Sequence, residues 1–171
     1  SPPGRGQGEG VAFWVKRGDV HNTQEGDVVF AADREKAARA LEGMAARGIG
    51  TAVLQEHVAG DLIKFYGIQS AEAGAHAKAE WFQWFYHRDQ RLAGHSFDAA
   101  SLEQAATQVA SALGLEVYGG DAIAAPSGRL VVIDVNAWPS FSLYRETASE
   151  RIAAHLAAVY REQAGRVRAL P

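Results

Sequence analysis

The chain has 171 residues, of which 47% are apolar and 22% are charged, and it contains no cysteine. This composition is typical of a globular protein that buries roughly 70% of its unfolded surface, and it excludes a disulfide framework or a thiolate metal site. The net charge of −3 argues against a broad nucleic-acid-binding surface, and no apolar run approaches the length of a membrane span.

The first third of the chain predicts a flexible segment, three strands and one helix. Residues 1–10 are rich in glycine and proline and lack the apolar core of a signal peptide, so we expect a flexible N-terminal segment. Alternating apolar residues predict strands at 11–17, 28–32 and 51–58. A helix is expected between the last two strands, with Asp33 as its N-cap and Gly48 at its C-terminal end.

Two further strands are predicted in the middle of the chain, and a hairpin is predicted near its end. Residues 61–68 form a strand after a tight turn at Ala59 and Gly60, and the aromatic run at 80–88 forms another strand. Residues 126–129, with the sequence Pro-Ser-Gly-Arg, are the expected loop of the antiparallel hairpin.

Two helices complete the predicted secondary structure. The first is expected at 99–113, where Ser101 and Gln104 have the spacing of a capping box. The second is expected at 147–163, with four residues facing inward: Ile152, Leu156, Val159 and Tyr160. The mixed order of strands and helices, with a late hairpin, indicates the α+β class, with antiparallel sheets and helices packed on them.

Two aspartates and an asparagine interrupt the apolar strands of the hairpin. With the loop given above, Ala125 faces Leu130 and, by the same count, Asp121 faces Asp134. Asn136 is two residues further along the same strand, so it projects from the same face. Cross-strand partners lie about 4.5–5.5 Å apart at Cβ. The hairpin therefore predicts a cluster of two carboxylates and one amide oxygen.

A divalent cation is the natural occupant of this cluster. Like charges placed opposite each other destabilise a sheet, and a cation between the two aspartates relieves that repulsion. Because all the ligands are oxygens, we expect Mg²⁺, with Mn²⁺ or Ca²⁺ as alternatives. Substrate phosphates and water usually complete the coordination of Mg²⁺, which indicates a phosphate-bearing substrate. The alternative is a solvated hairpin without metal, and a register slip of one residue would separate the two aspartates.

Two lysines and one polar strand end are further candidates for the same chemistry. Lys16 ends an apolar strand before a glycine-containing loop, so it is either a phosphate contact or a lysine that snorkels to solvent. Lys64 lies inside an apolar strand, which indicates a second phosphate or transition-state contact or an edge strand. Gln55, Glu56 and His57 end another strand, where backbone groups can bind a base edge or simply form a polar terminus.

Nearly the whole chain resembles the ATP-grasp superfamily, through the ordered stretches FWVKRGDVHN, VLQEHVAGDLIKFYGI, GLEVYGGDAIAA and LVVIDVNAWPSF. The resemblance implies that Lys16 contacts the phosphates of ATP. It also implies an adenine-binding hinge, formed by Gln55, Glu56, His57 and Val58.

The same resemblance implies the metal ligands and the catalytic residue. Asp121, Asp134 and Asn136 match the family's ligands for Mg²⁺, with Mn²⁺ as an alternative ion. Lys64 matches the strand residue that faces the phosphates and the acceptor. Family members mostly use ATP to convert a carboxylate to an acyl phosphate, which an amine or a thiol then attacks. The resemblance therefore implies an ATP-dependent ligase.

Two other functions are open on the same residues. Lys64 followed by Phe-Tyr-Gly, and the Asn-x-x-Pro-Ser run that begins at Asn136, look like the branch of small-molecule kinases that phosphorylate a hydroxyl, as inositol-phosphate kinases do. Kinases for highly phosphorylated substrates need a strongly basic pocket, however, and this chain is net acidic. The other alternative is a nucleotide-binding fragment without catalytic activity.

The resemblance also implies a domain arrangement and a set of partners. Residues 11–60 would be part of the first ATP-grasp subdomain, and residues 61–171 the second, with the metal-binding hairpin. Relatives usually have a preceding domain, so we expect an N-terminal domain or a partner chain to complete the site. We expect a cytoplasmic protein with a small-molecule carboxylate or hydroxyl acceptor, and with neither nucleic acid nor membrane as a partner.

Overall fold

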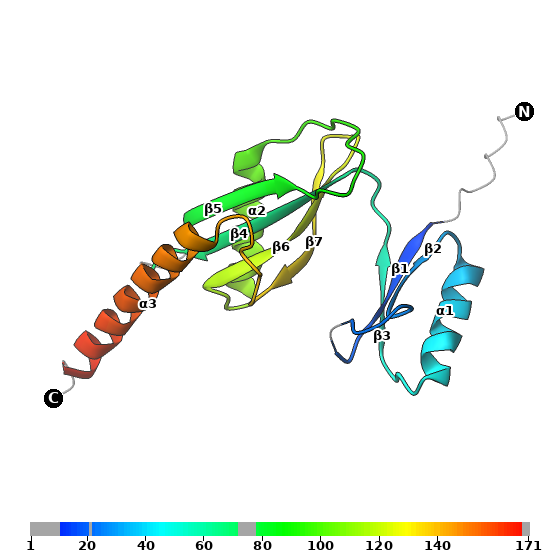
Figure 1. Ribbon diagram of the computed structural model, residues 1–171, viewed down its shortest axis with the longest axis horizontal. Coiled ribbons are helices and arrows are strands. Elements are labelled where there is room, and N and C mark those ends of the chain that lie inside the picture. The colour runs from blue at the N-terminus through cyan, green and yellow to red at the C-terminus, as the bar shows by residue number, and fades with distance from the viewer. Residues whose placement is uncertain (1–10, 21, 72–77, 169–171) are drawn as a thin grey trace, which may run out of the picture. The chain divides into compact units, whose positions relative to one another are not determined.

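The computed structural model describes residues 11–20, 22–71 and 78–168 (Figure 1). The segment predicted at 1–10 lies outside the described residues. The chain divides into two compact units, Ser1–Val58 (unit 1) and Ala59–Pro171 (unit 2). The described residues form two antiparallel sheets and three helices, which confirms the α+β class. None of the described helices is long and apolar enough to cross a membrane.

Unit 1 is a three-stranded antiparallel sheet with a helix on one face. Its elements are β1 (Phe13–Arg17), β2 (Val28–Ala31), α1 (Arg34–Ala46) and β3 (Ala52–Glu56), in the sheet order β2-β1-β3. Alternation along β1 turns Val15 towards α1, where it is fully buried with Ala31 and Met44. The two neighbours of Val15 in β1, Trp14 and Lys16, therefore project from the opposite face of the sheet.

Local signals set the two ends of α1 as predicted. The side chain of Asp33 accepts a hydrogen bond from the backbone N–H of Lys36 at 2.7 Å, which makes Asp33 the N-cap. Gly48 has a φ of 78°, a left-handed conformation that glycine adopts without strain. This conformation lets the N–H of Ile49 donate to the carbonyl of Met44 at 3.1 Å, which closes the helix.

Asp27 holds the loop that joins β1 to β2, directly beside the strand of Lys16. Its buried carboxylate accepts hydrogen bonds from the backbone N–H of Thr23 at 2.9 Å and from the guanidinium of Arg47 at 2.8 Å. Its backbone carbonyl accepts from the N–H of Arg17 at 2.7 Å. The N–H group of Thr23 and the other donors, including Arg47, lower the pKa of Asp27 to about 2.

We expect unit 1 to lose stability in acid because of Asp27. A lowered pKa means that the ionised form is favoured in the folded state, so this contribution is complete above the ordinary value of 3.8 and is lost as the pH falls towards about 2. The variant Asp27→Asn should be less stable at neutral pH and should lose this part of the pH dependence. Unfolding of unit 1, followed by backbone NMR signals between pH 5 and pH 2, checks both; equal pH profiles for the two proteins would contradict the assignment.

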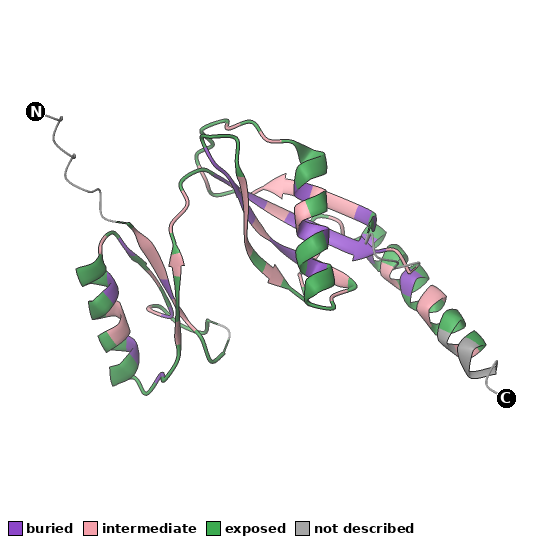
Figure 2. Ribbon diagram, turned by 180° about the vertical axis from the view of Figure 1, so that it is seen from behind, coloured by how far each residue is buried: buried purple, intermediate pink, exposed green. Residues whose placement is uncertain are grey.

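Unit 2 is a four-stranded antiparallel sheet with helices on both faces. Its elements are β4 (Asp61–Gln69), β5 (Ala79–Tyr86), α2 (Ala99–Ala112), β6 (Val117–Ala124), β7 (Leu130–Asn136) and α3 (Arg145–Arg168). The sheet order is β5-β4-β6-β7, so β4 and β6 are central, and they are buried along much of their length (Figure 2). On one face, α2 packs through Leu102, Ala106 and Ala110 against Phe65 and Tyr118.

One predicted detail of unit 2, the N-terminal cap of α2, is wrong. The N-cap of α2 is Asp98, whose carboxylate accepts from the backbone N–H of Ser101 at 2.7 Å and from its hydroxyl at 2.6 Å. Ser101 therefore lies inside the first turn and is not the cap. Ala59 and Gly60, where a tight turn is predicted, connect β3 to β4, and these two strands belong to different sheets.

The predicted inward face of α3 is confirmed at Ile152, which packs against a buried cluster of the sheet, but it is wrong at Leu156 and Tyr160. Among the residues of α3 whose burial is described, Ala148 and His155 are buried, whereas Leu156 is 57% exposed and Tyr160 is 74% exposed. The helix packs on the sheet through the small side chain of Ala148, and His155 contacts Glu116 through Nε2 at 3.0 Å. Its far half runs past the end of the sheet (Figure 1), so apolar character there does not report burial.

The hairpin of β6 and β7 differs from the prediction at two points that cancel each other. The loop has three residues, not four: Ala125 pairs with Arg129, and Gly128, with a φ of 78°, donates to the carbonyl of Ala125 at 2.9 Å. Leu130 therefore pairs with Ala124 and not with Ala125.

A β-bulge then restores the predicted register. Ala122 pairs with Val132 and Asp121 pairs with Asp134, so Ile133 is an extra residue on β7. The loop is one residue shorter than predicted, and the bulge adds one residue back. The predicted pairing of Asp121 with Asp134 is thereby confirmed, and Asn136 lies opposite Gly119.

Candidate functional site

Four polar residues that the sequence singles out lie together on one face of the unit 2 sheet. Lys64 on β4 pairs with Asp121 on β6, which pairs with Asp134 on β7, so the three residues form a row across the sheet. Asn136 lies two residues beyond Asp134 on the same strand. The neighbouring residues of these strands pack against α2, so the row projects from the opposite face. We call these four residues the Lys64 row.

An ion pair joins the first two residues of the Lys64 row. The ammonium of Lys64 lies 2.8 Å from one carboxylate oxygen of Asp121 and 3.2 Å from the other. Because β4 is a central strand, the edge-strand explanation of Lys64 is wrong. Lys64 already supplies a positive charge next to the paired aspartates, so the sheet does not need a metal ion to hold them together.

The other two residues of the Lys64 row are open to solvent. Asp134 and Asn136 are both exposed, and the side-chain oxygen of Asn136 accepts from the backbone N–H of Trp138 at 3.2 Å. The described residues contain no cluster of three or more His, Cys, Asp or Glu side chains that could hold a metal. A cation here would therefore rely on two carboxylates and the amide oxygen of Asn136, a set that fits Mg²⁺ or Mn²⁺ completed by phosphates and water.

The loop that follows β7 packs beside the Lys64 row. Gly119 has no side chain, and a Cβ atom placed there would lie 2.5 Å from the Cβ of Pro139. The loop therefore approaches the sheet closely at this point. Tyr66 anchors it further, because its hydroxyl lies 3.4 Å from that of Ser140 and its ring centroid lies 4.9 Å from that of Phe141.

A pocket of about 340 Å³ opens next to Lys64. Its lining includes His87 and Arg88 from the end of the aromatic strand and Ser142 from the loop after β7. Three basic side chains, those of Lys64, His87 and Arg88, thus line one pocket together with a single carboxylate, that of Asp89. Because basic groups outnumber acidic ones in this lining, the pocket suits an anionic ligand. Sequence reasoning missed His87 and Arg88, and the only signal for them was their place directly after a strand that pairs with the strand of Lys64.

Replacing Asp121 by Asn is expected to change the unfolding free energy of unit 2 by less than about 1 kcal/mol. The side chains of Lys64 and Asp121 are 32% and 26% exposed, and ion pairs with this degree of solvent access contribute little. Urea unfolding followed by circular dichroism measures the change. A loss of several kcal/mol would show that the pair is a requirement for folding.

The residues predicted to bind nucleotide lie in unit 1. Lys16 projects from the sheet face opposite α1, and its strand neighbours are Val28 and Val53, both about half exposed. Gln55 pairs with Trp14 on the same face, and Glu56 pairs with Phe13.

An aromatic cluster lies on this open face of unit 1. The ring of His57 lies 5.2 Å from that of Phe30, and its Nδ1 accepts a hydrogen bond from the indole N–H of Trp14 at 3.2 Å. The backbone N–H of His57 donates to the carbonyl of Ala12 at 2.8 Å, which ties the end of β3 to the start of β1. Val58 follows as the last residue of the unit.

The structure therefore brings the predicted residues together in two groups. Unit 2 carries the Lys64 row, and unit 1 carries Lys16 with the strand end at 55–58. Comparison of the sequence with protein-family models and with curated proteins finds no match, so these residues are the basis for a functional assignment.

Proposed function

We propose that this chain is an ATP- and Mg²⁺-dependent ligase of the ATP-grasp type, which joins a carboxylate to an amine or a thiol. The observation that carries the proposal is the Lys64 row, in which two carboxylates, an amide oxygen and an ammonium group lie on one face of the sheet. Acidic and basic groups in such a row match the needs of a metal-bound polyphosphate.

The oxygen ligands and the ammonium group of the Lys64 row are proposed to have different roles. Asp121, Asp134 and Asn136 would hold Mg²⁺, which when bound neutralises the charge of the phosphates. A metal and the Lys64 ammonium compete for the carboxylate of Asp121, because the ammonium lies only 2.8 Å from it. With Asp121 as a ligand of the metal, the ammonium of Lys64 would be available to stabilise the negative charge on the phosphoryl group in transfer.

The reaction then takes two steps. A carboxylate oxygen of the acceptor attacks the γ-phosphorus of ATP while the bond from that phosphorus to the oxygen of ADP breaks, which gives an acyl phosphate. The amine or thiol next attacks the acyl carbon, and phosphate leaves with the electrons of the carbon–oxygen bond. The pocket lined by Lys64 and Arg88, which we call the cationic pocket, is suited to hold the anionic acceptor beside the phosphates, away from the carboxylate of Asp89 in the same lining.

Unit 1 supports the nucleotide part of the proposal. Its open face combines exposed apolar side chains with the ammonium of Lys16. An apolar surface beside a cation suits a nucleotide, whose base is flat and apolar and whose phosphates are anionic. The backbone of Gln55, Glu56, His57 and Val58 is proposed to bind the adenine edge.

A small-molecule kinase is the second candidate, and the cationic pocket favours it. Lys64, His87 and Arg88 outnumber the one acidic residue, Asp89, in the lining of a pocket of about 340 Å³, although the chain as a whole is acidic. A pocket of this charge also suits a phosphorylated hydroxyl compound, which would receive the phosphoryl group without forming an acyl phosphate.

One assay separates the candidates. The full chain is incubated with ATP, Mg²⁺ and panels of carboxylates, amines and phosphorylated polyols, and ADP and products are measured. The ligase predicts ADP formation that requires both a carboxylate and an amine or thiol. A phosphorylated product without amine would replace the ligase by the kinase, and nucleotide binding without turnover for any acceptor would overturn both.

A further inference from the structure

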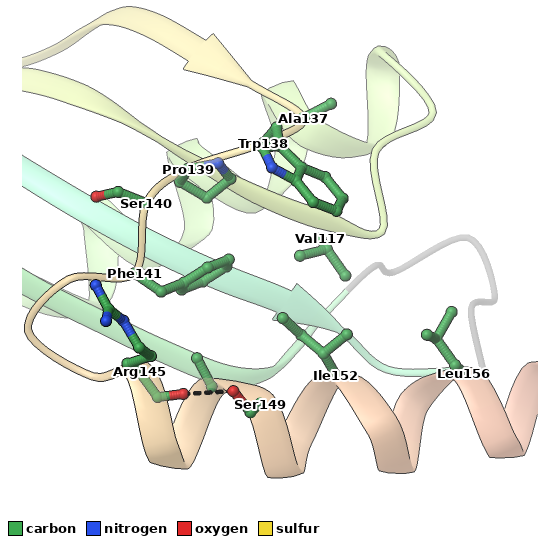
Figure 3. A pocket seen from close by; sticks show the side chains of 11 residues that line it. Val117, Ala137, Trp138, Pro139, Ser140, Phe141, Arg145, Ser149, Ile152 and Leu156 are labelled. Carbon is green, nitrogen blue, oxygen red and sulfur yellow. Dashed lines mark hydrogen bonds between the residues drawn. The ribbon is translucent and has the colours of Figure 1, made fainter.

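A second pocket of unit 2, of about 450 Å³, lies between the loop after β7 and the first turns of α3 (Figure 3). Val117 lines its floor, Phe141 lies on the loop side, and Ile152 and Leu156 project from α3. Its lining is thus mainly carbon. A concave apolar site of this size falls within the range of small-molecule pockets, roughly 300–1,000 Å³.

Large apolar side chains remain open to water at this pocket. Trp138 is 94% exposed, although its indole is turned towards the pocket, and Leu156 is 57% exposed. Phe141 has a φ of 50°, a conformation that is strained for an aromatic residue. Packing of its ring against Tyr66 and Trp81 holds it in place. The pocket wall is therefore formed in spite of two unfavourable features, the strained backbone of Phe141 and the exposure of Trp138 and Leu156 to water.

One cation stands at the end of the pocket. Arg145 is the first residue of α3, and among the described residues that line the pocket it is the one with a charged side chain. Within the described part of the chain, no acidic side chain forms an ion pair with its guanidinium. A hydrogen bond from the hydroxyl of Ser149 to the backbone carbonyl of Arg145, at 2.7 Å, ties down the helix turn that presents it.

We propose that this pocket binds a small organic acid with an aromatic or branched apolar body, whose carboxylate pairs with Arg145. Arginine presents a planar fork of N–H donors that matches the two oxygens of a carboxylate. The apolar body of such a ligand would cover Val117, Phe141 and Ile152 and would bring the exposed indole of Trp138 into contact. The charge of the lone guanidinium and the size of the cavity together favour this occupant over an uncharged ligand.

This site does not depend on the proposed nucleotide chemistry. None of the four residues of the Lys64 row is among the described residues that line the pocket. Binding of an acid here can therefore succeed or fail whether or not the chain turns over ATP.

The test uses three acids and their uncharged amides as probes: 4-phenylbutanoate, 4-methylpentanoate and indole-3-propanoate. Titration of the full chain, followed by calorimetry and by backbone NMR, should show at least one acid binding about tenfold more tightly than its amide. The shifted signals should lie at 137–141 and in the first turns of α3. The variant Arg145→Gln should lower the affinity for that acid to that of the amide.

Two further variants make the result specific. Arg151→Gln removes a positive charge from the same helix at an exposed position that does not line the pocket, so it should leave acid binding unchanged. Ser149→Leu fills the pocket from an exposed position and should block the acid and the amide alike. If this variant does not fold, the proposal is still tested by comparing the affinity of Arg145→Gln for the acid with the affinity of the unchanged chain for the amide.

Four results would overturn the proposal. Three of them are the absence of binding by all three acids at millimolar concentration, equal binding of acids and amides, and signal shifts centred away from the pocket. Shifts of the pocket signals with protein concentration alone would also overturn it, because they would assign the surface to a second copy of the chain.

Discussion

Replacing Asp134 by Asn is expected to lower ATP-dependent turnover about 100- to 1,000-fold while unit 2 stays folded. Asp134 is exposed on β7 opposite Asp121, so the substitution keeps the shape of the side chain and removes one of the two carboxylates of the Lys64 row. Loss of one preorganised electrostatic contact in an active site typically has an effect of this size. Release of ADP at saturating Mg²⁺ and acceptor measures it.

A matched variant controls for net charge. Glu150→Gln removes one negative charge from an exposed position on α3, which is not part of the Lys64 row. It should leave turnover within about twofold of the unchanged chain. Stabilisation by Mg²⁺ and ATP should follow the same pattern, since a bound ligand at 100 times its Kd adds about 2.7 kcal/mol. Equal turnover and equal stabilisation in Asp134→Asn would contradict the assignment of Asp134.

The substitution Gly67→Ala is expected to destabilise unit 2 by about 1–3 kcal/mol, the typical effect of overpacking a core. Gly67 lies in the central strand β4, where an added Cβ would approach the ring of Tyr118 to 2.2 Å. Tyr118 cannot move away easily, because it is fully buried and its hydroxyl lies 2.9 Å from that of Thr107. Burial also raises the pKa of Tyr118 to about 12, so the phenol stays neutral as a hydrogen-bonding group.

Urea unfolding of unit 2 measures the effect of Gly67→Ala. The control is Gly165→Ala on α3, where an added Cβ meets nothing within 4 Å beyond its chain neighbours and the adjacent backbone of its own helix. This control should be neutral or stabilising by up to about 1 kcal/mol, since alanine is the better helix former. If Gly67→Ala were as stable as Gly165→Ala, the close packing of β4 on Tyr118 would be refuted.

Local sequence signals were sufficient for the secondary structure of both units. The Asp33 cap and the glycine at position 48 act within one helix turn, so they can be read without knowledge of the fold. The N-cap of α2 shows the limit of such signals. Aspartate and serine are both good N-cap residues, so Asp98 and Ser101 are both suitable, and they place the start of the helix about one turn apart. The face of α3 was predicted correctly only at Ile152, since the exposure of Leu156 and Tyr160 depends on where the sheet ends.

At the hairpin, the predicted pairing of Asp121 with Asp134 is correct, although the predicted loop length is wrong and the bulge was not predicted. Loop length and bulge position each depend on backbone conformations, at Gly128 and around Ile133, that residue types indicate only weakly. The shorter loop and the bulge shift the register by one residue in opposite directions, so Asp121 still pairs with Asp134. That Lys64 completes the row was not foreseen from the spacing, because it depends on the pairing of β4 with β6 over a long sequence separation.

The cationic pocket lay beyond sequence reasoning for a similar reason. His87 and Arg88 follow an aromatic strand whose residues read as core, and their neighbours in the pocket come from β4 and from the loop after β7. Only the order of the strands in the sheet brings these three segments together.

The central claim is that the Lys64 row binds a divalent cation together with ATP, and paramagnetic broadening by Mn²⁺ tests it most directly. Mn²⁺ added with ATP to the isotopically labelled full chain should broaden the backbone signals around Asp121 and Asp134 first, and those of α2 on the other face of the sheet last. The variant Asp134→Asn should remove this selectivity. Broadening centred elsewhere in unit 2, or an unchanged pattern in the variant, would contradict the claim.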